Sequence, residues 1–148
     1  MKTFRRILHA TDFSSASRPA FAQAIALARQ NRAPLSVVHA LPPPAMIVGD
    51  GFVTPQTYEV IDRSARQYAR KQLTARVARA RRAGVRATAL LFDGTPHEQV
   101  LRAARRTRAD LIVIGTHGRS GLSKVLLGSV AERVVRFAPC PVLTVRSR

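Results

Sequence analysis

The sequence predicts an α/β protein: a single doubly wound domain in which helices cover both faces of a parallel sheet. Two observations support this prediction. Five short apolar segments alternate with segments of helical periodicity, an order typical of parallel βαβ units. Hydrophobic residues make up 46% of the 148 residues and aromatic residues only 5%. The core must therefore consist of Val, Ile, Leu and Ala, which suits buried parallel strands. Residues 1–148 are interpreted as one domain, long enough to bury such a core.

The predicted strands are apolar runs bounded by turn residues. In chain order they are Ile7–Ala10, Leu35–Leu41, Val85–Phe92, Leu111–Ile114 and Pro141–Val145. The fourth run is apolar throughout, which indicates a strand buried on both faces. In sheets of this kind ligands bind beyond the carboxyl ends of the strands, where the strand order reverses. The loops after Ala10 and after Ile114 are therefore the candidate sites.

Helices are predicted between the strands, over about 17–31, 56–83, 95–108 and 129–137. Ser17 can cap the first helix. The segment from Thr95 to Glu98 forms a capping box with Pro96 at the first helical position. The segment from Pro42 to about Pro55 shows neither the helical nor the strand pattern of apolar residues. We interpret it as a mobile lid or an irregular surface loop.

The chain has 25 Lys and Arg residues against 8 Asp and Glu, a formal charge of +17. Such an excess of positive charge favours non-specific binding to polyanions at low salt. The arginines are not gathered into one tail, however, and many lie along the helix predicted over 56–83. We expect a solvated helix face there, and we do not expect specific nucleic-acid binding.

A single cysteine, Cys140, excludes an intrachain disulfide and a paired-cysteine metal site, and we expect it to be a packing thiol. No apolar run approaches the roughly 18–20 residues of a membrane span. The first residues lack the apolar region and cleavage site of a signal peptide. We therefore expect a cytoplasmic protein without a membrane partner.

A glycine-rich segment runs from Gly115 to Ser129, between the most apolar strand and a predicted helix. Glycines allow a backbone to approach an anion closely. The free amides and the dipole of the helix that starts after Gly128 favour a negative charge. The segment lacks the Gly-Lys-Ser/Thr ending of a P-loop and the GxGxxG spacing of a dinucleotide fingerprint. We predict a phosphate-binding loop of another kind.

The glycine spacing is Gly115-x2-Gly118-x9-Gly128-Ser129. With it the chain resembles the universal stress protein family, whose ATP-binding members carry G-x2-G-x9-G-S/T. The resemblance covers nearly the whole chain. It includes, in order, residues 7–14 (ILHATDFS), 38–40 (VHA), 110–118 (DLIVIGTHG), 127–131 (LGSVA) and 139–145 (PCPVLTV).

The resemblance implies a sheet of order 3-2-1-4-5, with the strands numbered along the chain, and a site for ATP with or without Mg²⁺ or Mn²⁺. Asp12 would contact the ribose hydroxyls or help to orient the metal, and the backbone of Ala40 would meet the adenine edge. Ala10 and Thr11 would line the nucleoside. The phosphates would be surrounded by Gly115, His117, Gly118 and Arg119 and by the residues from Gly128 to Ala131. The implied nucleotide-binding residues are Ala10, Thr11, Asp12, Ala40, Ile114, Gly115, His117, Gly118, Arg119, Gly128, Ser129, Val130 and Ala131.

Two positions depart from the family pattern. ATP-binding relatives often have Pro where this chain has Ala10, and a hydroxyl residue where it has Ala131. Loss of one hydroxyl contact typically weakens binding by about 0.5–1.5 kcal/mol. We therefore expect a lower affinity rather than the loss of the site.

Structural roles remain open for several of these residues. Gly115 and Gly118 could serve only a tight crossing of the chain, and Asp12 could serve only to cap the turn after its strand. His9 and His39 lie in predicted strands and are expected to be structural. His117 lies where phosphates would bind, and we expect it to orient the loop.

We expect an ATP-binding regulatory protein of the stress response, with slow or no hydrolysis because no general base is evident. The alternative is a nucleotide-free structural or interaction protein of the same fold. The resemblance also implies a homodimer. The last strand, Val142–Val145, would form it, because an exposed apolar strand edge invites pairing with a second copy.

Overall fold

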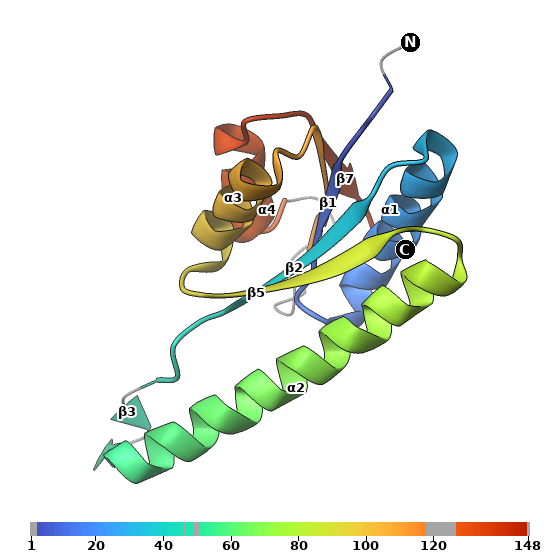
Figure 1. Cartoon of the computed structure of the whole chain (residues 1–148). Coiled ribbons are helices and arrows are strands. Elements are labelled where there is room, and N and C mark those ends of the chain that lie inside the picture. The colour runs from blue at the N-terminus through green and yellow to red at the C-terminus, as the bar shows by residue number, and fades with distance from the viewer. Residues whose placement is uncertain (1–2, 46, 49–50, 118–126, 148) are drawn as a thin grey trace.

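The computed structural model describes residues 3–45, 47–48, 51–117 and 127–147. Its centre is a five-stranded, wholly parallel sheet with the order β5-β2-β1-β6-β7 (Figure 1). The strands are β1 (Ile7–Ala10), β2 (Leu35–Leu41), β5 (Ala87–Asp93), β6 (Leu111–Gly115) and β7 (Val142–Val145). The predicted strand order is confirmed, since the numbering differs only through a small hairpin, β3–β4, that the sequence did not indicate.

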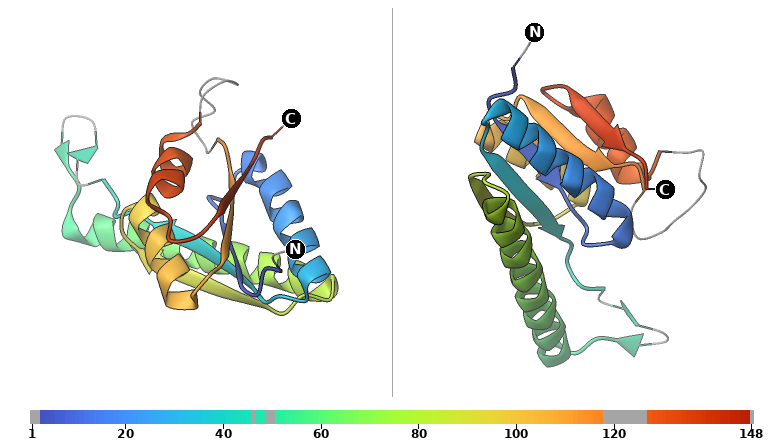
Figure 2. Two further views of the ribbon diagram at one scale, coloured as in Figure 1. Left: turned by 90° about the horizontal axis from the view of Figure 1, so that it is seen from above. Right: turned by 90° about the vertical axis from the view of Figure 1, so that its right-hand side faces the viewer.

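Helices cover both faces of the sheet, as the apolar strands require. They are α1 (Arg18–Asn31), α2 (Pro55–Arg82), α3 (Pro96–Thr107) and α4 (Ser129–Phe137). α1 and α2 lie on one face, and α3 and α4 lie on the other (Figure 2). The doubly wound α/β class is therefore confirmed, with element ends within about two residues of the predicted ones.

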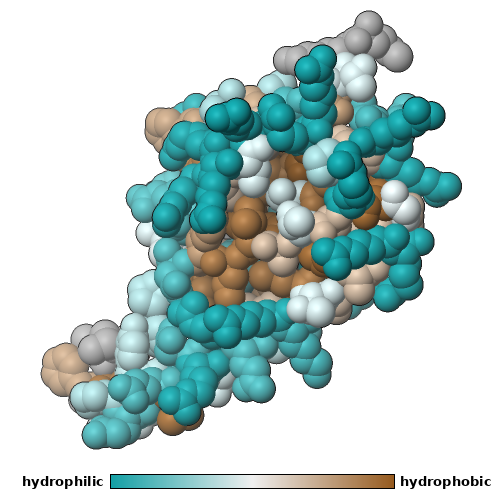
Figure 3. Space-filling model, in the orientation of Figure 1, coloured by the Kyte–Doolittle hydropathy of each residue, from teal (hydrophilic) through white to brown (hydrophobic). Residues whose placement is uncertain are grey.

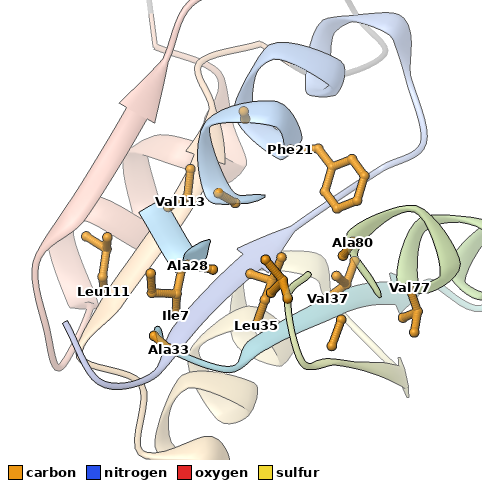
Figure 4. Close-up of a cluster of buried hydrophobic side chains, with 14 of the residues drawn as sticks. Ile7, Phe21, Ala28, Ala33, Leu35, Val37, Val77, Ala80, Leu111 and Val113 are labelled. Atoms are coloured by element: carbon orange, nitrogen blue, oxygen red, sulfur yellow. The ribbon is translucent and has the colours of Figure 1, made fainter. Parts of the chain in front are cut away.

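Alternate residues of the central strands point into two separate cores, because side chains in a strand alternate between its faces. Ile7 of β1 packs on the side of α1 and α2, together with Phe21 and Val77 (Figure 4). Its neighbour Leu8 packs on the side of α3 and α4, together with Val100. The position of any residue along β1 thus decides which helices it meets.

The caps predicted for two helices are wrong in their chemistry. Ser17 is the N-cap residue of α1, but its hydroxyl donates to the carbonyl of Ser14 (2.8 Å) instead of accepting from a helix amide. Thr95 is the N-cap residue of α3 and makes no side-chain cap bond either. Both helices have proline in the first turn, and proline has no amide proton that needs a partner.

The N-terminal part of α2 extends beyond the sheet, next to the hairpin of β3 (Ile47–Val48) and β4 (Gly51–Phe52) (Figure 1). This hairpin lies within the segment that the sequence predicted as a lid or an irregular loop. Arg66 of α2 donates two hydrogen bonds to Asp93, the last residue of β5 (2.6 and 3.3 Å). Among the described residues, no helix is long and apolar enough to cross a membrane.

Candidate functional site

The carboxyl ends of β1 and β6 lie side by side at the centre of the sheet, with Ala10 paired to Ile114. The chain leaves β1 toward α1 on one face and leads from β6 to α4 on the other, so a crevice forms between the two exits. A cavity of about 350 Å³ lies at this position. Its size is within the range of sites for small organic ligands.

Buried apolar and buried polar residues both line the cavity. Val38, Val100 and Ile114 are the apolar residues that are almost fully buried, and Thr11, Ser17, His39 and Thr116 are the buried polar ones. Asp12 and Ser129 line it as well and bring a carboxylate and a hydroxyl. A slot of this kind can hold a flat, uncharged ring together with a polar or charged tail.

Hydroxyl groups fix the loop between β1 and α1. Ser17 donates its single hydroxyl proton to the Ser14 carbonyl, so the hydroxyl of Thr11 must donate to Ser17 Oγ (3.2 Å). The Phe13 amide in turn donates to Thr11 Oγ1 (3.0 Å). Thr11 and Ser17 are buried, and these hydrogen bonds therefore define the shape of the loop without competition from water.

Asp12 begins this loop and lines the cavity. Its Oδ1 accepts hydrogen bonds from the amide (2.9 Å) and the hydroxyl (2.5 Å) of Ser14. Aspartate often stabilises a turn in this way, by bonding to the backbone two residues ahead. The capping role considered for Asp12 is therefore present, and it holds the carboxylate where it lines the cavity.

Gly115 has a packing role at the end of β6. A β-carbon at this position would lie 3.3 Å from the carbonyl oxygen of Ala16 and 3.7 Å from Cα of Ser17. The end of β6 and the turn after β1 therefore approach each other more closely than a side chain would comfortably allow. A tight crossing of the chain is therefore present at Gly115, in the buried end of β6 rather than at the surface. A contact of its backbone with phosphate remains a prediction.

The N-terminus of α4 opens into the cavity. The amide of Gly128, its N-cap residue, donates to the carbonyl of Thr116 (2.6 Å), which brings the end of the glycine-rich segment back to β6. Gly128 has no side chain to cap the helix, and the amides of Ser129, Val130 and Ala131 have no acceptor within the helix. All three residues line the cavity. Helix amides in this arrangement attract an anion.

The two strand histidines have structural hydrogen bonds. His9 and His39 each place Nδ1 close to a backbone carbonyl, that of Val113 (3.0 Å) and that of Thr11 (2.8 Å), so Nδ1 carries the proton in both. Burial lowers the pKa of His9 to about 4, and its ring is therefore neutral. His9 lies outside the cavity lining, as a structural role requires, although its buried Nε2 has no hydrogen-bond partner among the described residues. His39 lines the cavity, so its structural role alone remains a prediction.

The cavity brings together eleven of the thirteen residues implied by the sequence. These are Ala10, Thr11, Asp12, Ala40, Ile114, Gly115, His117, Gly128, Ser129, Val130 and Ala131. The other two, Gly118 and Arg119, lie outside the described residues. His117 places Nδ1 2.9 Å from the hydroxyl of its neighbour Thr116.

Among the described residues, six more line the cavity and were missed: Ser17, Val38, His39, Pro96, Val100 and Thr116. A signal existed for some of them. Val38 precedes Ala40 by two residues, so both side chains lie on the same face of β2. Pro96 and Val100 are four residues apart, a spacing that puts them on one face of a helix. That this face meets the cavity depends on the packing of α3, which the sequence does not show.

The fold and the site together define a class of protein, a doubly wound α/β domain with a cavity at its switch point. The model of the universal stress protein family matches residues 3–146. This chain belongs to the universal stress protein family. A universal stress protein of Thermus aquaticus is 38% identical over 143 residues, which cover 97% of this chain and 99% of the relative. One of Bacillus subtilis is 32% identical over 147 residues, with 97% and 99% covered.

Solved structures of the same family agree in fold. A family member from Burkholderia pseudomallei is 31% identical and has a TM-score of 0.78, with 99% of both chains covered. The universal stress protein of Archaeoglobus fulgidus in complex with dAMP is 25% identical, with a TM-score of 0.67 and 98% and 100% covered. A universal stress protein in complex with cAMP is also 25% identical, with a TM-score of 0.69 and 99% and 100% covered.

Proposed function

We propose that this protein binds an adenine nucleotide in the cavity between β1 and β6, and that the nucleotide is ATP. The observation that carries the proposal is that buried apolar side chains and the N-terminus of α4, which has no side-chain cap bond, line one cavity. The apolar side chains suit an adenine ring, and the helix amides suit phosphates. The dAMP and cAMP complexes of two relatives support an adenine nucleotide. The choice of ATP rests on the glycine spacing.

The residues that line the cavity suggest an orientation for the ligand. The adenine ring would lie near Val38 and Val100, with its edge at the backbone of Ala40. The ribose would lie near Asp12, and the phosphates would extend toward the amides that begin at Ser129. Gly118 and Arg119 would complete the phosphate contacts, as the resemblance implies.

A metal ion would accompany the nucleotide rather than occupy a site of its own. Within the described ranges, no group of three His, Cys, Asp or Glu side chains could hold a metal. Asp12 is the single acidic side chain among the described cavity residues. Mg²⁺ is commonly held by one or two carboxylates together with substrate phosphates. Asp12 therefore fits the part of one ligand to Mg²⁺ or Mn²⁺ on bound ATP.

We propose a regulatory role with slow or no hydrolysis. Rapid transfer of the γ-phosphoryl group requires a positioned water and neutralisation of the developing charge. Arg119 would supply positive charge, but the single carboxylate of the described lining, Asp12, is already bonded to Ser14, and no general base is evident among the described lining residues. The second candidate, a nucleotide-free interaction protein of the same fold, is disfavoured by the apolar cavity at the helix terminus.

The direct test uses protein purified without added nucleotide. The protein is denatured, and its supernatant is chromatographed for adenine nucleotides; the refolded or nucleotide-free protein is then titrated with ATP, AMP and GTP in a calorimeter. We expect adenine nucleotides to bind more tightly than GTP. Absence of co-purified nucleotide, together with no heat of binding for ATP or AMP at millimolar concentration, would leave the nucleotide-free alternative.

We further propose that the protein acts in the stress response of the cytoplasm as a homodimer. β7 lies at one edge of the sheet. Leu143 and Val145 pack against one core and Val142 against the other, and all three remain partly exposed. A second copy could cover this edge by pairing with the same strand about a twofold axis.

A further inference from the structure

β5 forms the edge of the sheet opposite β7, and no strand of the described segments pairs with its outer side. It is seven residues long, and β2 pairs with it along its whole inner side. Exposed edges are usually protected by charged residues, prolines or bulges within the strand. The first six residues of β5 (ATALLF) contain no charge and no proline, and its one charged residue, Asp93 at the end of the strand, is paired with Arg66. This edge is therefore long enough, and regular enough, to accept another strand.

The hydrogen bonds of β5 show which of its residues face outward. In a parallel strand the N–H and C=O of one residue point to the same side, and those of the next residue point to the other side. Just before the strand, the Arg86 carbonyl accepts from the Leu35 amide of β2 (2.8 Å). Just after it, the Gly94 amide donates to the Leu41 carbonyl of β2 (3.0 Å). Even-numbered residues of β5 therefore face β2, and odd-numbered residues face away from the sheet.

Among the outward residues, the two in the middle of β5 are open to pairing. Arg81 of α2 covers the Ala87 carbonyl with two donated hydrogen bonds (3.2 and 3.0 Å). Ala89 and Leu91 follow at the next two outward positions. Each offers one N–H and one C=O, so together they provide four groups for a backbone ladder.

The face beside this edge is apolar and has arginines at its border. Leu90 and Phe92 lie on the side of α3 and are only partly buried. The guanidinium carbons of Arg102 and Arg106 lie 5.1 and 5.5 Å from the centroid of the Phe92 ring. In the orientation of Figure 1, the space-filling view shows an apolar area in the middle of this side of the molecule, surrounded by hydrophilic side chains (Figure 3).

These two arginines have no carboxylate partner in the part of the chain that the structure describes, where the ion pairs involve Arg66 and Arg136. A partner that pairs with β5 would therefore gain by bringing negative charge. A second copy of this chain does not fit, because the same edge of a second molecule would bring its own arginines against Arg102 and Arg106. A nucleic acid would supply charge, but it has no backbone that can continue a β-ladder.

We propose that the outer edge of β5 binds an acidic peptide segment in extended conformation, which adds a strand to the sheet. The peptide backbone pairs with Ala89 and Leu91. Apolar side chains on one face of the peptide contact Leu90 and Phe92, and its carboxylates pair with Arg102 and Arg106. This inference does not depend on the proposed nucleotide site, because the cavity of that site lies at the carboxyl ends of β1 and β6.

The test uses a short fluorescein-labelled peptide of alternating Glu and Val, titrated with the full chain and followed by fluorescence anisotropy. A peptide of alternating Lys and Val and a single-stranded oligo-dT are the comparison probes. We expect the Glu–Val peptide to bind at least about tenfold more tightly than the Lys–Val peptide, since like charges at the arginines oppose binding. The amides of Ala89 and Leu91 should become protected from hydrogen exchange when the acidic peptide is added.

Two variants separate the charge contacts from the backbone contacts. The pair Arg102→Gln and Arg106→Gln should weaken peptide binding by about three- to tenfold. The matched pair Arg105→Gln and Arg133→Gln, which removes the same charge from exposed positions of α3 and α4, should change it by less than about twofold. Ala89→Pro removes an outward N–H and spares the ladder with β2, and it should weaken binding by about tenfold. Circular dichroism checks that each variant is folded.

Several results would overturn the proposal. One is no binding of the Glu–Val peptide at millimolar protein, and another is equal binding of the Lys–Val peptide. If both double arginine variants lose the same amount of peptide affinity, the arginines act only through the net charge of the protein and not through a specific contact. If the oligonucleotide binds more tightly than the peptide and Ala89→Pro leaves both unchanged, the surface is a general polyanion site. Bound peptide without protection of the Ala89 and Leu91 amides would place the peptide elsewhere.

Discussion

The phenyl ring of Phe13 stacks on the imidazole of His39, with the ring centroids 4.1 Å apart and the planes 28° from parallel. The backbone of Phe13 has a φ of 66°, in the left-handed region that bulky side chains rarely adopt. Such a conformation persists only where its surroundings enforce it. Here the amide of Phe13 bonds to Thr11, and Arg76 of α2 places its guanidinium carbon 4.7 Å from the ring centroid. The loop that carries Asp12 is thus held partly from α2.

This arrangement predicts an energetic coupling between Phe13 and Arg76. Burial lowers the pKa of Arg76, and a partly desolvated guanidinium interacts more strongly with an aromatic face. In a double-mutant cycle with Phe13→Leu and Arg76→Gln, measured by urea denaturation, we expect a coupling of about 0.5–1 kcal/mol. Arg79 is the matched control, because its guanidinium lies over Phe21 instead (5.7 Å). A coupling of Phe13 to Arg79 as large as that to Arg76 would contradict the prediction.

The buried His9 predicts a dependence of stability on pH. Its pKa is about 4 in the folded protein against 6.5 for an exposed histidine, so the unfolded chain takes up a proton first as the pH falls. Neutral His9 makes its full contribution to the free energy of unfolding above about pH 6.5. This contribution is lost progressively down to about pH 4, where the folded protein also takes up the proton. Between pH 7 and pH 5 this one residue should lower the free energy of unfolding by about 2 kcal/mol.

The measurement for His9 is urea denaturation of the wild type and of His9→Gln at several pH values. The variant loses the Nδ1–H···O bond to Val113 and should be less stable at pH 7. Its curve should also be flatter, so that the two proteins become more similar in stability toward pH 4. Parallel curves for the two proteins between pH 7 and pH 5 would show that His9 does not carry this dependence.

The N-terminus of α4 predicts an informative proline substitution at Ser129. Ser129 is the first residue of the helix, a position where proline is favoured because its missing N–H has no intrahelical partner. The preceding Gly128 has φ of −60° and ψ of 155°, which suits a residue before proline. Ser129→Pro should therefore keep or slightly raise the melting temperature while removing one amide from the proposed phosphate site. We expect nucleotide affinity to fall by about tenfold, as for the loss of a hydrogen bond to a charged group.

Ser129→Ala is the control for this substitution, since it removes the hydroxyl and keeps the amide. Calorimetry with ATP should show a smaller loss for Ser129→Ala than for Ser129→Pro. Equal affinities for the wild type and Ser129→Pro would mean that the first helix amide does not contact the phosphates.

Much of the fold and of the candidate site could be predicted from the sequence. The uninterrupted apolar runs at Ile7 and Leu111 indicate strands covered on both faces, and a parallel sheet places residues such as Asp12 and Gly115 at a common edge. The missed features depend on tertiary contacts. Ser17 has the right type and position for a cap, but the Ser14 carbonyl competes for its hydroxyl. The contribution of Val100 to the cavity follows from the packing of α3, which periodicity does not specify.

The close packing around Gly115 predicts that a larger residue at this position lowers the stability of the protein, whether or not a ligand is bound. The β-carbon of Gly115→Ala would lie 3.3 Å from the Ala16 carbonyl, so the turn after β1 must move by a few tenths of an ångström. We expect a loss of stability of about 1 kcal/mol, at the low end for overpacking, seen as a lower midpoint in urea. Gly51→Ala is a suitable control, because no atom lies within 4 Å of the added carbon. A fully stable Gly115→Ala protein would show that the contact is relieved without cost.

The two edges of the sheet predict different effects of proline on self-association. In β7 the Val145 carbonyl accepts from Thr116, and the carbonyl of Pro141, just before the strand, accepts from Ile112. Odd-numbered residues of β7 thus face β6, and the N–H of Thr144 faces outward. Thr144→Pro should therefore remove a donor from the proposed dimer contact and spare the ladder with β6.

We expect sedimentation equilibrium to show at least about a tenfold weaker dimer for Thr144→Pro, which corresponds to about 1.4 kcal/mol. Ala89→Pro, the equivalent change at the β5 edge, should leave the dimer unchanged, because a second copy would bring its arginines against Arg102 and Arg106 there. A dimer that weakens with Ala89→Pro and not with Thr144→Pro would place self-association on β5. It would also contradict the proposal that the β5 edge binds an acidic peptide, because that proposal assumes that a second copy pairs with β7 and leaves β5 open.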